Sequence, residues 1–149
     1  MSDRNLEAFC GLYCGACYTY VARQRGTLAD HAASRGRPLE DAKCNGCRSG
    51  VLSSSCRDCT LRDCAQERGL TSCGDCFDMP CDELLRITKL LPHLVEIVGN
   101  LERLREVGSA EWLDEQAAHW ACPACKTPGS WYEVKCTACG HDLPAGYTR

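Results

Sequence analysis

Hydrophobic residues recur at helical spacing in the middle of the chain. Leu94, Ile97, Val98, Leu101 and Leu104 stand at positions i, i+3, i+4, i+7 and i+10, which is the pattern of an amphipathic helix. The residues between them are largely charged or polar. We therefore expect a helix whose apolar stripe is buried in a core.

Other residues mark where the neighbouring helices begin and end. Asp82 suits the first turn of a helix, because the helix dipole favours negative charge there, and Pro92 should break or kink that helix. Gly108 ends the central helix, and Ser109 can cap the next one, which has the sequence SAEWLDEQAAHW. Residues 82–118 are therefore predicted to form a helical segment that packs on the N-terminal region.

Periodicity is weaker in the first 81 residues. Short helices are predicted at 16–25, 27–35 and 61–69, and the Gly- and Ser-containing stretch at 48–55 is predicted to be a loop. Large apolar residues are few, so this region does not bury enough surface to fold unaided. It needs another source of stability.

Cysteine is the candidate for that source, since 15 of the 149 residues are cysteine. The N-terminal stretch MSDRNLEAF lacks the apolar region of a signal peptide, and no apolar run is long enough to span a membrane. We therefore predict a cytoplasmic protein with no membrane partner. Thiols stay reduced in the cytoplasm, so the cysteines are predicted to be metal ligands rather than disulfides.

The C-terminal cysteines have the spacing of a zinc site. CPACKTPGSWYEVKCTACG contains two C-x2-C pairs separated by ten residues, and two such pairs complete a sulfur tetrahedron around one zinc ion. Four thiolates leave no open position, so the site would be structural. The stretch at 130–134, SWYEV, is predicted to be the strand of a β zinc ribbon over residues 119–149. The predicted ligands are Cys122, Cys125, Cys136 and Cys139.

The other eleven cysteines lie in residues 1–81. Two complete four-cysteine sites would use eight of them, which with the C-terminal site makes about three zinc ions. A third site in this region would need a twelfth ligand, and His31 is the only histidine here, although a lone histidine is more often a surface or core residue. The pairing of ligands stays open. The predicted ligands are Cys10, Cys14, Cys17, Cys44, Cys47, Cys59, Cys64, Cys73, Cys76 and Cys81.

These motifs resemble an uncharacterised bacterial and archaeal family known only as a domain of unknown function. CGxxCxxCxxY starts at Cys10, CxGC at Cys44, CxxRxC at Cys59 and CxxCxxxPC at Cys73. The later helix and the C-terminal cysteine segment are similar to longer members, so the resemblance covers nearly the whole chain. It supports the fold and the metal sites and implies no activity. Cys56 is less regular in this pattern, which makes it the expected non-ligand.

The spacing C-x3-C-x2-C of Cys10, Cys14 and Cys17 is also that of radical enzymes that cleave S-adenosylmethionine. That class is excluded, because its barrel is far longer than this chain and its glycine-rich motif is missing. Ala16 also stands where those enzymes usually carry an aromatic residue. Zinc is favoured for residues 1–81, and one or more [4Fe–4S] clusters remain the alternative, since cysteine-only sites suit both.

The fold class we predict is therefore mostly α: a small metal-stabilised Cys-rich domain at 1–81, the helical segment at 82–118 and the C-terminal β zinc ribbon. No Cys/His/Asp arrangement for catalysis is recognisable, so we predict no enzyme but a zinc-dependent binding or adaptor module for protein. The alternatives are an iron–sulfur electron carrier or redox sensor, and a nucleic-acid-binding protein. The net charge of −3 disfavours nucleic acid, although Trp131 and Tyr132 could stack on bases.

Overall fold

The computed structural model describes residues 3–144 and 146–148. Every regular element in this part of the chain is helical, and none of these helices is both long and apolar enough to cross a membrane. The α-helices are α1 (Tyr18–Gln24), α2 (Leu28–Ser34), α3 (Leu39–Ala42), α4 (Ser54–Arg57), α5 (Thr60–Glu67), α6 (Asp82–Ile87), α7 (Ile97–Val107) and α8 (Ser109–Trp120). Short 3-10 helices are η1 (Arg4–Leu6), η2 (Cys14–Ala16), η3 (Cys73–Asp75) and η4 (Pro92–Glu96).

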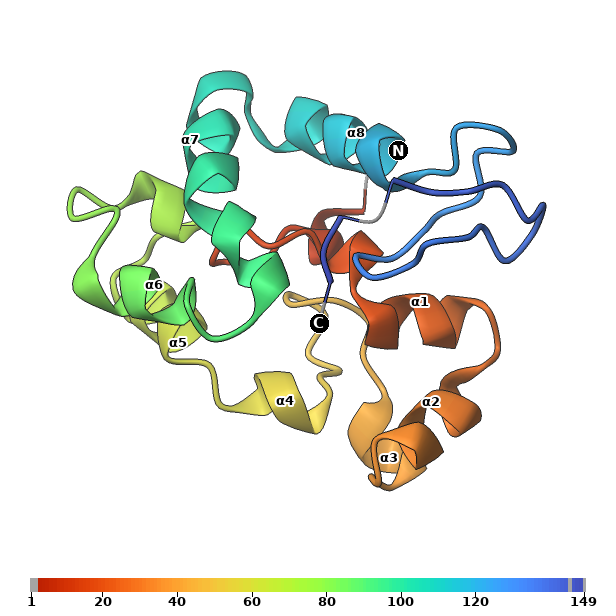
Figure 1. Ribbon diagram of the computed structural model, residues 1–149. Coiled ribbons are helices and arrows are strands. Elements are labelled where there is room, and N and C mark those ends of the chain that lie inside the picture. Colours follow the sequence, from red (N-terminus) through yellow and green to blue (C-terminus); the bar gives the residue numbers. More distant parts are fainter. Residues whose placement is uncertain (1–2, 145, 149) are drawn as a thin grey trace.

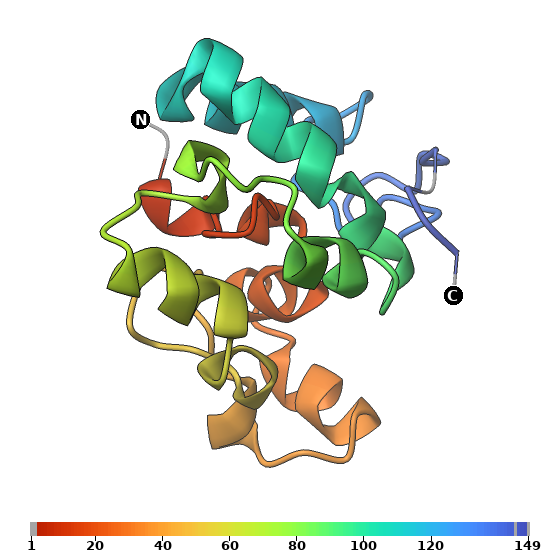
Figure 2. The same cartoon turned by 90° about the vertical axis from the view of Figure 1, so that its left-hand side faces the viewer.

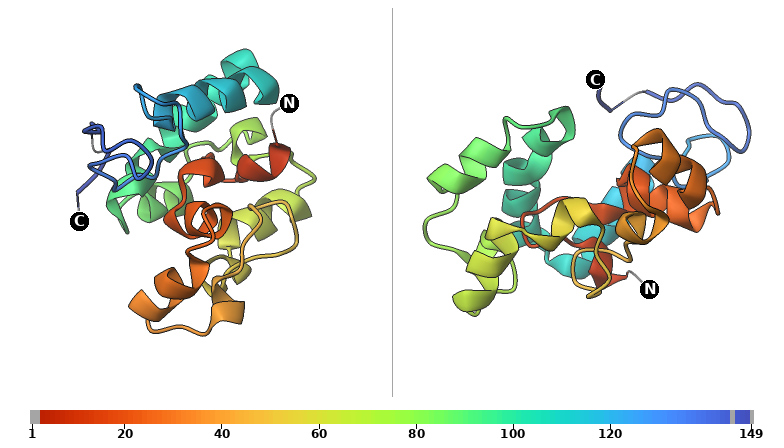
Figure 3. Two further views of the ribbon diagram at one scale, coloured as in Figure 1. Left: turned by 90° about the vertical axis from the view of Figure 1, so that its right-hand side faces the viewer. Right: turned by 90° about the horizontal axis from the view of Figure 1, so that it is seen from below.

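The N-terminal segment with η1 and η2 runs through the middle of the molecule (Figure 1). Helices α7 and α8 cover it on one side, and α1, α2 and α3 lie on the other side (Figure 2). The C-terminal loops lie beside α1 and α2, far from α6 (Figure 3). The segment from η1 to η2 is therefore central to the packing of both later regions.

Helix α7 carries the predicted apolar stripe. Ile97 and Leu101 are fully buried, and they form a core cluster with Leu61 of α5 and Leu84 of α6. Gly108 ends α7 with a φ of 82°, a conformation that glycine adopts without strain. The prediction that Ser109 caps α8 is wrong. Gly108 occupies the N-cap position of α8, and Ser109 is its first helical residue.

The short N-terminal helices fall close to their predicted positions. Helices α1, α2 and α5 lie within or next to the predicted ranges, and Gly69 follows α5 with a φ of 69°. The predicted loop at 48–55 is irregular as far as Ser53, and α4 begins at Ser54. Local turn and helix signals therefore locate these elements even though the region has few large apolar residues.

A second core cluster joins distant parts of the chain. Tyr13 and Ala16 near the N-terminus pack with Trp112 of α8 and with Trp131 of the C-terminal segment. The rings of Tyr13 and Trp112 meet edge to face, with centroids 6.2 Å apart. This cluster takes members from all three sequence regions that were predicted as separate units.

The predicted C-terminal β zinc ribbon is wrong. The described part of the chain contains no β-strand, only isolated bridges, of which two lie here, Ala121 with Pro128 and Lys135 with Asp142. Trp131 is 1% exposed, and its backbone N–H donates to the carbonyl of Ala16 at 3.3 Å. The carbonyls of Trp131 and Val134 instead accept from backbone N–H groups within the C-terminal segment, those of Tyr147 and Leu143. Burying the indole in the N-terminal core favours this irregular path over a regular strand ladder.

Candidate metal centres

Four C-terminal sulfurs converge on one point. All four Sγ atoms lie within 4.8 Å of one another, with Cys122–Cys139 at 3.7 Å and Cys125–Cys136 at 3.5 Å. A zinc tetrahedron with Zn–S bonds of ~2.3 Å has sulfur–sulfur edges of about 3.8 Å. This group, Cys122, Cys125, Cys136 and Cys139, could therefore hold a single metal ion.

Two equivalent turns place these sulfurs. In the first turn the N–H of Lys126 donates to the carbonyl of Cys122 at 2.8 Å, and in the second the N–H of Gly140 donates to the carbonyl of Cys136 at 2.9 Å. Lys126 and Gly140 both have a positive φ, 64° and 74°. Each C-x2-C pair is thus a tight local turn that presents both of its sulfurs on one side.

The electrostatics of the exposed sulfur Cys125 favour a thiolate. The hydroxyl of Thr127, 3.2 Å from the sulfur, and a backbone hydrogen bond at the same residue lower the pKa of the Cys125 thiol to about 6. A thiolate is the form that binds metal. The turn that positions this ligand therefore also prepares it for a cation.

Seven further cysteines line one cavity of about 360 Å³. They come from the N-terminal segment, from the loop after α3, from α4 and from the N-cap of α5. They are Cys10, Cys14, Cys17, Cys44, Cys47, Cys56 and Cys59. Sulfurs that are up to 49 positions apart in the sequence (59 − 10) thus share one enclosure.

Burial opposes charge on these thiols. Desolvation raises the pKa of Cys10, Cys14 and Cys17. Neighbouring thiols raise these pKa values further, because a second negative charge nearby is unfavourable. A cation would reverse this balance, since a coordinated thiol loses its proton.

Backbone N–H groups point at several of the same sulfurs. The N–H of Gly46 donates to Cys44 Sγ at 3.4 Å, and the N–H of Arg62 donates to Cys59 Sγ at 3.5 Å. A backbone hydrogen bond from Leu12 partly offsets the raised pKa of Cys10. Hydrogen bonds to sulfur stabilise the thiolate, so the backbone here is arranged for anionic ligands.

The remaining four cysteines form a third group around a smaller cavity of about 60 Å³. Burial and the neighbouring thiol of Cys81 raise the pKa of Cys73 to about 12. The guanidinium of Arg68 lies 3.3 Å from Cys76 Sγ. This group consists of Cys64, Cys73, Cys76 and Cys81.

The fifteen cysteines thus divide into groups of seven, four and four. Within the described ranges, the C-terminal group alone brings three or more Cys, His, Asp or Glu ligand atoms within 4.8 Å of one another. The ten predicted N-terminal ligands are all in one of the other two groups. Their assignment as ligands stays a prediction.

Sequence reasoning did not anticipate the position of Cys56, which lines the large cavity although it was the expected non-ligand. It also gave no role to Arg62, which is 8% exposed and lines the same cavity. The Arg62 side chain donates to the carbonyl of Cys56 at 2.7 Å. Burial raises the pKa of Cys47, and the charge of Arg62 offsets part of that rise. The arginine inside the CxxRxC motif was the available signal.

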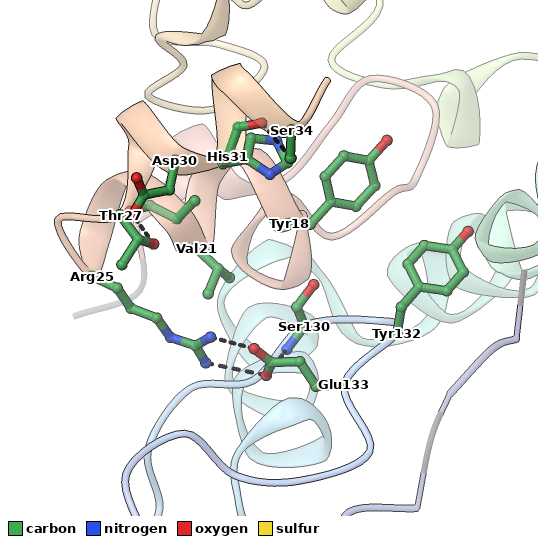
Figure 4. A pocket seen from close by; sticks show the side chains of 11 residues that line it. Tyr18, Val21, Arg25, Thr27, Asp30, His31, Ser34, Ser130, Tyr132 and Glu133 are labelled. Carbon is green, nitrogen blue, oxygen red and sulfur yellow. Dashed lines mark hydrogen bonds and ion pairs between the residues drawn. The ribbon is translucent and has the colours of Figure 1, made fainter. Parts of the chain in front are cut away.

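His31 does not line either of the two N-terminal cysteine cavities. It lines a separate cavity of about 420 Å³ between α1, α2 and the C-terminal segment (Figure 4). Its Nε2 is 3.1 Å from the hydroxyl of Thr19. In the same cavity the guanidinium of Arg25 points at the carboxylate of Glu133 and forms an ion pair with it (Figure 4). This cavity therefore marks where the C-terminal segment docks.

The family comparison matches residues 6–86 to a family described as "Protein of unknown function (DUF3795)". The match covers more than half of the chain, so the chain belongs to this family, which confirms the resemblance seen in the motifs. All eleven N-terminal cysteines lie inside the matched range, whereas α7, α8 and the C-terminal cysteine group lie outside it. Comparison with curated proteins and with solved structures found no match.

Proposed function

We propose that this protein binds metal through its cysteine groups and that the C-terminal group holds one structural zinc ion. The observation that carries the proposal is the convergence of the four sulfurs Cys122, Cys125, Cys136 and Cys139 within 4.8 Å. A site of four thiolates is closed, so the ion would stabilise structure and not activate a substrate.

The position of this group indicates what the zinc would stabilise. The two cysteine turns flank Trp131, the residue that the C-terminal segment inserts into the core beside Tyr13. Ser130 adds a hydrogen bond from its hydroxyl to the carbonyl of Ala16 at 2.9 Å. A metal ion that ties the two turns together would hold both ends of this inserted segment.

The test is elemental analysis of the purified full chain and of two matched variants. Cys139→Ala should lose one equivalent of zinc per chain relative to the unchanged protein. Lys135→Ala is the control, because Lys135 is an exposed neighbour of the same turn that pairs with Asp142, and it should keep the full zinc content. Equal metal content in both variants would refute the site.

The protein-binding role predicted from the sequence stays a prediction. The nucleic-acid alternative loses part of its basis, since Trp131 is buried and cannot stack on a base. The iron–sulfur alternative concerns residues 1–81, which contain both the large cavity and the third cysteine group.

A further inference from the structure

A further cavity, of about 210 Å³, lies where the N-terminal segment meets η3, the end of α7 and the start of α8. No cysteine is among the described residues that line it, and most of its lining is polar or charged. The space holds several water molecules, at ~30 Å³ each in the liquid, or one small organic molecule. Its polar groups therefore indicate what kind of molecule would fit.

The carboxylate of Glu7 lines this cavity and is only 1% exposed. Its Oε2 is held by two arginines, with Arg48 Nη2 at 3.1 Å and Arg4 Nε at 3.4 Å. Its Oε1 is buried as well, and among the described residues this atom has no hydrogen-bond partner. A buried carboxylate oxygen without a donor is unfavourable. The cavity therefore needs a hydrogen-bond donor from outside the chain.

A second carboxylate, that of Asp75, lines the same cavity and accepts from the hydroxyl of Thr71. Two carboxylates favour a positively charged group such as an ammonium. They do not form a metal site, because within the described ranges three or more close ligand atoms occur in the C-terminal cysteine group alone. An organic cation is thus the better fit to this side of the cavity.

Groups that favour an anion line the cavity too. Helix α8 begins here, with Gly108 as its N-cap and Ser109 as its first helical residue. The first N–H groups of a helix have no partner within the helix, and glycine has no side chain that could accept from them. Arg105 adds a guanidinium, which donates to the carbonyls of Gly74 and Cys76. A helix N-terminus and a guanidinium both favour a carboxylate.

We propose that this cavity binds a small free amino acid, with its ammonium on Glu7 and its carboxylate at the N-terminus of α8. A bare anion would meet the carboxylates of Glu7 and Asp75, and a bare cation would meet Arg105 and the positive end of the helix. A zwitterion satisfies both sides. Leu104 has the one large apolar side chain among the described lining residues, so a small polar amino acid such as serine fits best.

The experiment uses the full chain under reducing conditions and L-serine as the probe. Amide NMR spectra are recorded as L-serine is added to millimolar concentration. Saturable shifts are expected in residues 71–75 and 109–110. Absence of a saturable shift there would show that water alone fills the cavity and would overturn the proposal. The inference goes beyond the proposed zinc site and does not depend on it, because zinc content is measured in the same sample.

Two blocked forms of the probe test the two ends of the ligand separately. N-acetyl-L-serine lacks the ammonium, and L-serinamide lacks the carboxylate. Each should bind at least about tenfold more weakly than L-serine, because each leaves charged groups of the cavity without a partner. Unchanged affinity for either analogue would overturn the assignment of that end.

A substitution at Glu7 tests the ammonium side. Glu7→Gln should weaken L-serine binding at least about tenfold, because the ammonium loses its counter-charge. Glu102→Gln, on the exposed surface of α7, is the matched control and should leave the affinity unchanged. Native amide dispersion and unchanged zinc content show that Glu7→Gln is folded. Equal affinities in the two variants would refute the role of Glu7.

Substitutions at Ser109 test the carboxylate side even where Glu7→Gln does not fold. Ser109→Pro removes one N–H from the start of α8, and proline is well tolerated at the first position of a helix. This variant should bind L-serine about tenfold more weakly, whereas Ser109→Ala keeps the N–H and should bind nearly as well as the unchanged protein. The same affinity in both variants would overturn the placement of the carboxylate at α8.

Discussion

The two ends of this chain assemble cysteines in different ways. The C-terminal group takes four sulfurs from residues 122–139, and each turn that presents them closes with a hydrogen bond between residues four apart. The large cavity takes seven sulfurs from residues 10–59 and encloses them between helices and loops. A local site therefore needs little of the fold, whereas the cavity and the fold around it depend on each other.

The pKa values of the thiols also differ between the C-terminal group and the large N-terminal cavity. In the C-terminal group, hydrogen bonds at Thr127 and among the thiols lower the pKa of Cys125, and those among the thiols raise that of Cys139. In the large N-terminal cavity, burial raises the pKa of Cys10, Cys14 and Cys17. A cation would stabilise the N-terminal thiolates, because burial disfavours the charged form of these thiols.

Removal of all metal should abolish the tertiary structure of residues 1–81 and leave partial helicity in α7 and α8. A structural zinc site contributes an apparent ~10–16 kcal/mol in small peptides, whereas a whole domain is usually stable by only ~5–15 kcal/mol. The buried stripe of α7 retains some apolar packing without metal. Amide dispersion and far-UV circular dichroism, before and after treatment with a strong chelator under reducing conditions, measure both parts.

Elemental analysis must confirm that the treated sample is free of metal. Native amide dispersion in such a sample would show that the cysteines are not structural ligands. The different cysteine arrangements of residues 1–81 and of the C-terminal group would then need an explanation other than metal binding.

Single cysteine variants should show how far each perturbation spreads. In Cys139→Ala we expect faster amide hydrogen exchange mainly within residues 119–144, because the sulfur lies in a local exposed turn. In Cys14→Ala we expect faster exchange from η2 to α5, because its cavity is built from all of these elements. Equally wide effects in both variants would mean that the chain is one cooperative unit.

Trp131→Ala should destabilise the protein by about 3–5 kcal/mol, the range for removing a large buried aromatic side chain. Trp131 is 1% exposed and packs against Tyr13, Ala16 and Trp112. The matched control is Val134→Ala three residues later, because Val134 is 60% exposed and should change stability by less than about 0.5 kcal/mol. Urea unfolding of the metal-loaded proteins measures both, and similar midpoints would mean that docking of the C-terminal segment contributes no stability.

Glu96→Gln should stabilise the protein slightly at neutral pH. Burial raises the pKa of Glu96, whose Oε2 accepts from the hydroxyl of Tyr147. A raised carboxyl pKa means that the folded state favours the protonated form, so this stability is present below the unfolded pKa of about 4.3 and is lost as pH rises through the folded pKa. Glutamine keeps an acceptor and removes the charge.

Thermal unfolding of Glu96→Gln and of the unchanged protein at two pH values above 6 tests this, with zinc content held equal. Glu102→Gln on exposed α7 surface is the control and should have almost no effect. A destabilised Glu96→Gln protein would show that the carboxylate contributes more through its hydrogen bonds than its burial costs.

The sequence alone determined those features whose cause lies within a few residues. The stripe of α7 repeats every three or four positions, Gly108 ends that helix, and the two C-terminal C-x2-C pairs form their own turns. The N-terminal motifs were equally readable, and they identified the family. Periodicity, glycine conformation and ligand spacing act locally, so they can be read without knowing the fold.

Tertiary structure decided the features that depend on distant partners. Residues 130–134 have the composition of a strand, but Trp131 is buried against residues more than a hundred positions earlier, so no ribbon strand forms. Cys56 has an irregular place in the sequence pattern, yet the fold brings it to the same cavity as Cys17 and Cys44. A shared core and a cavity form where elements that are distant in the sequence pack together. The spacing of residues along the chain does not predict which elements will pack together.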